Sequence, residues 1–99
     1  MEKLTKEQVI NVYNSEEWKN WTDEEIVKFQ LFQDKLAVPF DKFHAAMETV
    51  LGRGIYTHEF ADTRALQAEY LDGEPPPTFE EILSMIPAEK RVILGIDRE

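Results

Sequence analysis

Three short segments of the sequence carry a capping box, the pattern of a helix start in which Ser or Thr is followed three residues later by Glu or Gln. They are T-K-E-Q at residues 5–8, T-D-E-E at 22–25 and T-F-E-E at 78–81. At the first two, apolar residues on either side of the cap have the spacing of a hydrophobic staple; the pairs are Leu4 with Val9 and Trp21 with Ile26. The third follows three prolines, which predict a stiff, extended approach. The sequence therefore predicts a helix at each of these places.

The most regular apolar stripe lies between residues 41 and 52. Its members recur at the i, i+3, i+4, i+7 and i+8 spacing of one helix face: Phe43, Ala46, Met47, Val50 and Leu51. This pattern predicts a helix that is entered from Asp41 and ended by Gly52, because glycine readily adopts the left-handed turn of a helix end.

Further apolar patterns predict the remaining helices. Apolar residues cover more than one face of the helix that starts at Thr22, so we expect that helix to be central and contacted from two sides. Two helices are predicted later in the chain, one lined by Leu66, Tyr70 and Phe60 before Gly73, and a short one lined by Ile82, Leu83 and Ile86 and closed by Pro87. A last turn or two is predicted over residues 88–94, ended by Gly95.

Two short segments, residues 36–40 and 54–57, fit a helix poorly, since they are apolar and contain proline or β-branched residues. They flank the predicted Phe43 helix, and a two-strand ribbon between them remains an alternative, with Pro39 restricting it to an edge. The predicted fold is mainly α: a single domain over residues 1–99, built as a compact bundle of four to six short helices.

Composition limits the function. The net charge is −9 from twenty acids and eleven bases, and both halves of the chain contribute to the excess. Direct nucleic-acid binding is disfavoured, because it depends on clustered Lys and Arg, and a charged partner should be a basic protein. The sequence has no cysteine and begins without an apolar signal segment, so we expect the cytoplasm and no membrane insertion.

The segment His58-Glu59-Phe60-Ala61-Asp62 comes closest to a chemical motif. It differs at one position from the H-E-x-x-H helix of zinc proteases, in which ligands at i and i+4 share a face. His58, Glu59 and Asp62 are therefore weak metal candidates, which would need a third ligand such as His44 or Glu48. The simpler interpretation is structural, with Thr57 or Asp62 capping a helix and Glu59 in its first turn. We favour the structural interpretation and predict no metal and no cofactor.

Nothing in the sequence indicates catalysis. Ser15 and Ser84 are the two serines, and neither lies in G-x-S-x-G. The segment Gly52-Arg53-Gly54 lacks the remainder of a phosphate-binding loop. We therefore expect a protein that is not an enzyme.

Binding of another protein remains as the predicted activity, and two kinds of residue are candidates for it. Trp18 and Trp21 could form an interface, since tryptophan often dominates binding energy, although both also suit a core edge. The acidic pairs Glu16 with Glu17 and Glu80 with Glu81 are candidates to face a basic partner.

The segment FQDKLAVPFDKFHAAMETVLGRGIYTHEF resembles small uncharacterised proteins encoded by phages and prophages, in which a G-x-x-[FY]-T-H-[EQ] run follows such a helix. The likeness covers roughly residues 30 to 70 and implies a viral setting without a mechanism. Together with the charge, it suggests a non-enzymatic accessory protein that binds a host macromolecule in the host cytoplasm. One such role is inhibition of a nucleic-acid-processing or defence enzyme, as in anti-restriction or anti-CRISPR proteins. The alternatives are a metal-binding module or metal-dependent enzyme centred on His58, Glu59 and Asp62, and a virion assembly component.

Overall fold

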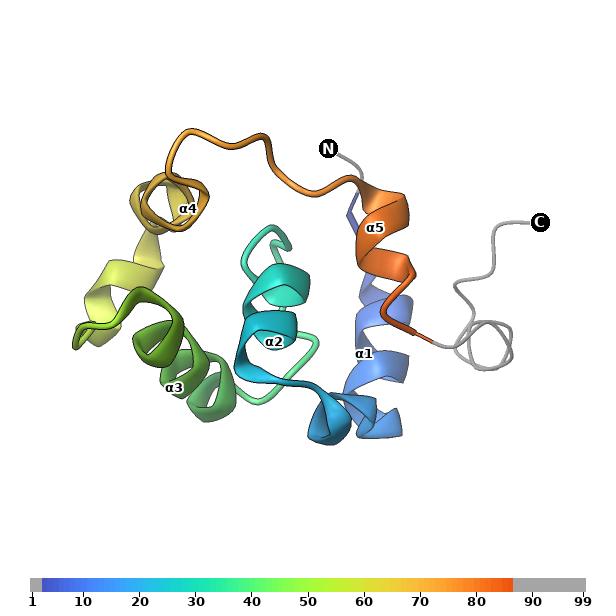
Figure 1. Cartoon of the computed structure of the whole chain (residues 1–99). Helices are drawn as coiled ribbons and strands as arrows, with labels where there is room; N and C mark the ends of the chain where they lie inside the picture. The colour runs from blue at the N-terminus through green and yellow to red at the C-terminus, as the bar shows by residue number, and fades with distance from the viewer. Residues whose placement is uncertain (1–2, 87–99) are drawn as a thin grey trace.

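The three capping boxes each start a helix in the computed structural model, which describes residues 3–86. In each, the threonine side chain accepts a hydrogen bond from the backbone N–H three residues on, and the Gln or Glu at that position accepts one from the threonine N–H. The elements are α1 (Lys6–Ser15), the 3-10 helix η1 (Glu17–Asn20), α2 (Asp23–Gln30), α3 (Phe40–Leu51), the 3-10 helix η2 (Thr57–Ala61), α4 (Arg64–Leu71) and α5 (Phe79–Leu83). The described chain is thus mainly helical, as predicted (Figure 1).

The helix predicted from the Phe43 stripe is α3. It ends where the sequence indicated, because Gly52 adopts a φ of 71° and donates its N–H to Glu48 O at 2.9 Å. Phe43, Ala46 and Met47 are buried on it, whereas Val50 and Leu51 are half-buried. The deepest part of the stripe is therefore its N-terminal half.

Helix α2 lies between two apolar clusters, with α3 and α4 on one side and α1 and α5 on the other (Figure 1). Phe29 contributes to the cluster with α1 and α5, whereas Ile26 and Val27 contribute to the cluster with α3 and α4. Trp21, just before α2, packs against both. The prediction of a central helix contacted from two sides is confirmed.

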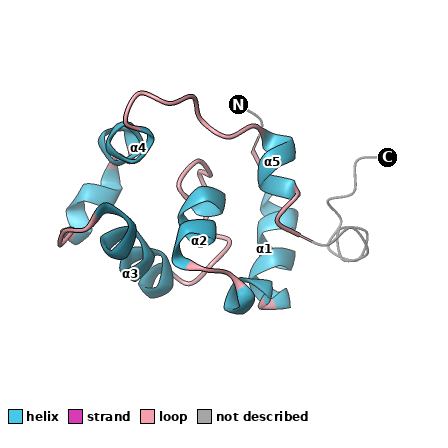
Figure 2. Ribbon diagram, in the orientation of Figure 1, coloured by secondary structure: helices cyan, strands magenta, loops and turns pink. Residues whose placement is uncertain are grey.

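The alternative of a two-strand ribbon is wrong, since residues 36–40 and 54–57 form no strand and residues 3–86 contain helices and loops alone (Figure 2). Side chains satisfy the backbone of these segments instead. Gln30 accepts the Ala37 N–H at 2.7 Å and donates to Lys35 O at 2.8 Å. On the other segment, Ile55 N donates to Glu48 Oε2 at 2.9 Å. Backbone groups paired in this way have no need of a partner strand.

Two details differ from the expected helices. Phe60 belongs to η2 rather than to α4, where its ring packs edge-on against Phe40 and Phe43. Ile86 is buried, but it follows the end of α5. The turn predicted over residues 88–94 and its end at Gly95 lie outside the described residues.

None of the described helices is long and apolar enough to cross a membrane.

Candidate functional site

A groove of about 580 Å³ lies between α2, the end of α3, α4 and the proline segment. We call it the acidic groove, because its lining includes five carboxylates and one ammonium group: Glu24, Glu69, Asp72, Glu74, Glu81 and Lys28. Its remaining lining is mostly apolar or aromatic: Val50, Leu51, Tyr70, Leu71, Pro75 and Pro77. A groove of this kind combines apolar contact area with a strong negative potential.

Tyr70 and Glu24 tie two walls of the acidic groove together. The Tyr70 hydroxyl on α4 donates to Glu24 Oε1 on α2 at 2.7 Å. Burial and this hydrogen bond to a carboxylate raise the pKa of Tyr70 well above its ordinary value. Tyr70 is therefore a stable donor that fixes the Glu24 carboxylate on the rim.

The turn after α4 places two further acids at the groove. Asp72 ends α4 with a left-handed φ of 47°, and Gly73 continues the turn with a φ of 88°. The Asp72 and Glu74 backbone N–H groups donate to Ala68 O at 3.0 Å and Leu71 O at 2.9 Å. No hydrogen bond or ion pair occupies the Asp72 or Glu74 carboxylate within residues 3–86. Both are exposed, so their charge is available to a partner.

The opposite wall is formed by the start of α5 and by α2. Glu81 accepts hydrogen bonds from Thr78 as part of the third capping box, and its Oε2 lies 3.8 Å from Lys28 Nζ. Among residues 3–86, Lys28 is the one cation in the groove lining. It offsets a single carboxylate, and the groove remains net negative.

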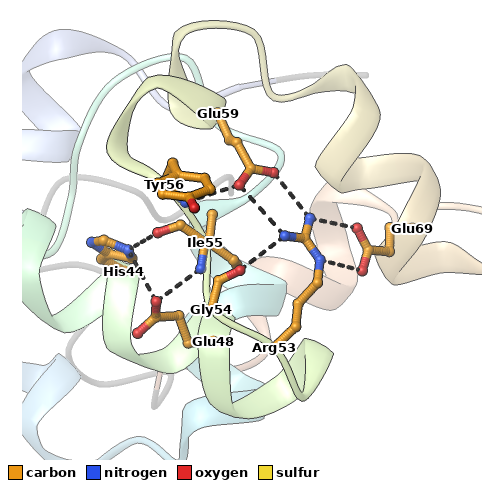
Figure 3. A network of polar contacts seen from close by, with 8 residues as sticks. All are labelled: His44, Glu48, Arg53, Gly54, Ile55, Tyr56, Glu59 and Glu69. Atoms are coloured by element: carbon orange, nitrogen blue, oxygen red, sulfur yellow. Dashed lines mark hydrogen bonds and ion pairs between the residues drawn. The ribbon is translucent and has the colours of Figure 1, made fainter.

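Glu69 is held in place by a polar network next to the acidic groove (Figure 3). Arg53, just after α3, donates from Nε and Nη2 to the two Glu69 carboxylate oxygens, each at 2.9 Å. The same guanidinium donates to both Glu59 oxygens, at 3.0 and 3.4 Å, and to Gly54 O at 3.0 Å. Arg53 lowers the pKa of Glu59 and of Glu69, and the two carboxylates raise the pKa of Arg53. One arginine therefore joins the 52–59 loop to α4.

The network continues to two side chains of α3. His44 Nε2 lies 2.6 Å from Ile55 O and 3.5 Å from Glu48 Oε2, which also accepts the Ile55 N–H (Figure 3). Since a carbonyl oxygen only accepts, the short contact places the proton of His44 on Nε2. His44 and Glu48 are thus engaged in holding the loop.

The three weak metal candidates point to different partners. Glu59 binds Arg53 and accepts the Tyr56 N–H at 2.8 Å. His58 stacks on Tyr56, with ring centroids 5.5 Å apart. Within residues 3–86, no group of three or more His, Cys, Asp or Glu side chains is arranged to hold a metal ion.

Asp62 has a structural role at the start of α4. It accepts the Arg64 N–H at 3.1 Å and pairs with the Arg64 guanidinium, which lowers the pKa of Asp62 to about 2. Thr63, and not Asp62 as predicted, occupies the cap position of α4, although Asp62 accepts the N–H of the first residue of that helix.

Trp18 lies in the core, and Trp21 is half-buried and packs against it. Trp18 is 8 % exposed and donates its indole N–H to Tyr13 O at 3.0 Å. The ring of Trp21 packs at a tilt of 41° against Phe29, with ring centroids 4.8 Å apart. This agrees with the alternative in which the pair covers a core edge, and it leaves little indole surface of Trp18 for a partner.

The two acidic pairs differ in their settings. Glu16 is exposed and forms an ion pair with Lys19 at 3.0 Å, whereas Glu17 is buried. Glu80 and Glu81 are both exposed in the first turn of α5, and Glu81 lines the acidic groove. The structure thus joins one of the four predicted acids to a larger acidic surface.

The sequence did not indicate most of the acidic groove, because the residues that line it lie on four separate segments. Glu24, Glu69, Asp72 and Glu74 are unremarkable in a chain with twenty acids. The segment Asp72-Gly73-Glu74-Pro75-Pro76-Pro77 is one available signal, since an acidic turn leading into a stiff proline segment holds its charges at a fixed place.

No curated protein and no solved structure matches the chain. One family model matches residues 24–77, which is more than half of the 99 residues and runs from the first turn of α2 to the last of the three prolines. Four of the five groove acids fall inside the matched region, and Glu81 falls outside it. The chain therefore belongs to the family described as a domain of unknown function, DUF7736.

Proposed function

We propose that this protein is a non-enzymatic binding protein that presents the acidic groove to a basic surface of another protein. The observation that carries the proposal is the groove itself, whose lining combines five carboxylates and one ammonium group with apolar and aromatic side chains. A positively charged segment would gain both ionic contacts at the rim and burial on Tyr70 and Leu71.

The preorganisation of the groove supports the same function. Tyr70 holds Glu24 and Arg53 holds Glu69, so these carboxylates are fixed before a partner arrives. Fixed side chains lose less conformational freedom on binding than mobile ones. Asp72 and Glu74 add exposed charge on a turn with defined backbone hydrogen bonds.

The biological setting that we propose is a phage or prophage accessory protein acting in the host cytoplasm. It rests on the resemblance of residues 30 to 70 to small phage-encoded proteins, although the run Gly54-Ile55-Tyr56-Thr57-His58-Glu59 has one residue fewer between glycine and tyrosine than the run in those proteins. The net charge of −9 suits a role in which the protein occupies the nucleic-acid site of a host enzyme. Restriction and CRISPR enzymes are examples of such targets.

The test is capture of host proteins on the immobilised full chain, with a pair of charge-reversed variants. Asp72→Lys with Glu74→Lys changes the groove, and Glu16→Lys with Asp34→Lys makes the same change in net charge at exposed acids outside it. We expect the groove variant to lose the captured protein and the control to retain it. Capture should also weaken steeply from about 0.1 M to 1 M salt, as the screening length falls from about 10 Å to 3 Å.

A second measurement addresses occlusion. The captured protein should bind nucleic acid when alone and lose that binding as this protein is added, in a gel-shift titration. Equal capture by both variants, or capture that is unchanged in 1 M salt, would contradict the acidic groove as the binding surface.

A further inference from the structure

The two ends of the acidic groove differ in charge, as two residues of α2 show. Glu24 and Lys28 both line the groove and lie four residues apart on α2, on one face and about 6 Å apart along the helix axis. Glu24 is bound by Tyr70 of α4, whereas Lys28 Nζ lies 3.8 Å from Glu81 Oε2 of α5. The connection between α4 and α5 passes from one side of α2 to the other (Figure 1). One end of the groove therefore belongs to α4 and the other to α5.

The α5 end of the groove already holds a cation. The Lys28 ammonium group pairs with the Glu81 carboxylate, which also accepts hydrogen bonds from Thr78. A second cation at this end would be repelled by Lys28 and would compete with it for Glu81. We therefore expect the positive charge of a partner to lie at the α4 end.

The α4 end has carboxylate oxygens that are available to a cation. Asp72 and Glu74 lie on the exposed turn directly after α4, and no hydrogen bond or ion pair within residues 3–86 occupies either carboxylate. Tyr70 donates to one oxygen of Glu24, Oε1, and leaves the other oxygen of that carboxylate to a partner. Three acids can thus contribute to binding one positive charge at this end.

Apolar side chains lie in the same groove as these carboxylates. The Tyr70 ring is held in place, because its hydroxyl donates to Glu24 and its ring packs against Phe32 with centroids 6.2 Å apart. A cation with a flat and weakly hydrated face suits such a surface better than a compact, strongly hydrated one. The half-buried apolar and aromatic side chains of the lining are Val50, Leu51, Tyr70 and Leu71.

Arginine has these properties and lysine does not. The guanidinium group is planar and more weakly hydrated than an ammonium group, so it can lie on an aromatic ring while its edge donates to carboxylates. With a carboxylate it forms two parallel hydrogen bonds, whereas an ammonium group acts as a point charge. Arg53 and Glu69 show this two-bond geometry next to the groove, with both donor–acceptor distances at 2.9 Å.

We propose that the acidic groove recognises an arginine side chain of its partner at the α4 end, with the guanidinium group against the Tyr70 ring and bound by Asp72 and Glu74. Apolar residues next to that arginine in the partner cover Leu51 and Leu71. This inference rests on the function proposed above and specifies the partner: its bound segment carries an arginine flanked by apolar residues, and lysine is a poor substitute for that arginine.

The experiment uses three short peptides that differ in one side chain. They are acetylated and amidated tripeptides with leucine on both sides of arginine, lysine or citrulline, the last being an uncharged side chain of nearly the same shape as arginine. Each is titrated into the ¹³C-labelled full chain, and the NMR signals of the Tyr70 ring and the Leu71 methyl groups are followed. We expect the arginine peptide to shift both sets of signals. It should bind about fivefold more tightly than the lysine peptide and at least about tenfold more tightly than the citrulline peptide, the ratios for one net hydrogen bond and for a charged one.

Variants of the chain locate the bound arginine. Asp72→Asn with Glu74→Gln should weaken the arginine and lysine peptides and remove the difference between them. Glu16→Gln with Asp34→Asn makes the same change in net charge at exposed acids outside the groove and should preserve that difference. Lys28→Met should tighten both charged peptides about twofold, the effect of removing a like charge about 10 Å away in water, and should leave the citrulline peptide unchanged.

The outcomes separate this inference from the proposed function. Equal affinities for the arginine and lysine peptides, both lost in the Asp72 and Glu74 variant, would overturn the preference for arginine and leave the groove as a site for basic segments. No binding of the arginine peptide, or binding that this variant retains, would overturn the whole inference. The proposed function would then be decided by the capture experiment with the charge-reversed variants.

Discussion

Arg53 and Glu69 form a two-pronged ion pair, in which Nε and Nη2 of the arginine each lie 2.9 Å from a different oxygen of the carboxylate. The pair joins the loop after α3 to α4, sixteen residues further along the chain. Because Glu59 binds the same guanidinium, one side chain links the loop, η2 and α4.

The pH dependence of stability tests this network. Arg53 lowers the pKa of Glu59 and Glu69 in the folded protein. Their contribution is therefore complete above about pH 4.5, where they are ionised in the unfolded chain, and is lost as the pH falls through the lower folded values. We expect the melting temperature to fall more steeply between about pH 5 and pH 3 in the unmodified protein than in Arg53→Gln. Lys19→Gln, which removes a cation from a single exposed pair, serves as the control for net charge. Parallel curves for Arg53→Gln and the unmodified protein would contradict the network's role.

The loop after α2 should depend on Gln30. In Gln30→Met the buried Ala37 N–H loses its acceptor and Lys35 O loses a donor. Two unmade hydrogen bonds at a buried site should lower the free energy of unfolding by about 2 to 4 kcal/mol, measured by urea denaturation. Leu36→Ala changes an exposed side chain in the same loop, and its effect should stay within about 0.5 kcal/mol. Similar losses for both variants would mean that the loop is held by its apolar contacts instead.

The helical phase of α3 gives a graded prediction. Phe43 is 4 % exposed, and Phe43→Ala should cost about 3 to 5 kcal/mol of unfolding free energy. Leu51 is half-buried, so Leu51→Ala should cost less, about 1 to 2 kcal/mol. Ala45→Ser, on the exposed face, should cost about 0.5 kcal/mol. The order of the three midpoints in denaturant checks the assignment, and an inverted order would show that the wrong face was taken as buried.

Metal binding by the His58 segment can be tested by thermal melting. A ligand at about 100 times its dissociation constant adds roughly 2.7 kcal/mol, a shift of several degrees for a domain of this size. Because His58, Glu59 and Asp62 contact different partners, we expect zinc, manganese and chelator to leave the melting temperature unchanged. A reproducible increase with zinc that disappears in His58→Ala would restore the metal-site alternative.

Local signals predicted the helices well, and the reason is chemical. A capping box and the left-handed turn at Gly52 are satisfied by residues a few positions apart, so their outcome depends little on the remainder of the fold. The stripe that starts at Phe43 likewise specified α3, because side chains at this spacing lie together on one face of a helix and can be buried together.

The loops and the acidic groove were not predictable in the same way. Residues 36–40 had the composition of a strand, but Gln30, seven positions before Ala37, took the hydrogen bond that a strand would have used. The acidic groove needs Glu24 and Tyr70, which meet across 46 positions of sequence. No pattern within a single segment indicates such a meeting, since it depends on how α2 and α4 pack.

The position of α2 between two apolar clusters determines which parts of the molecule can unfold separately. Its buried residues serve both clusters, so separating either α1 and α5 or α3 and α4 from it leaves its contacts with the other cluster in place. The amide hydrogens of α2 are therefore released to solvent only when both sides have come apart, that is, in global unfolding. Those of α1 and α5, which come from opposite ends of the described chain, exchange once a single cluster opens. Hydrogen exchange along this chain should consequently be slowest in the middle of the fold, in a helix of only eight residues.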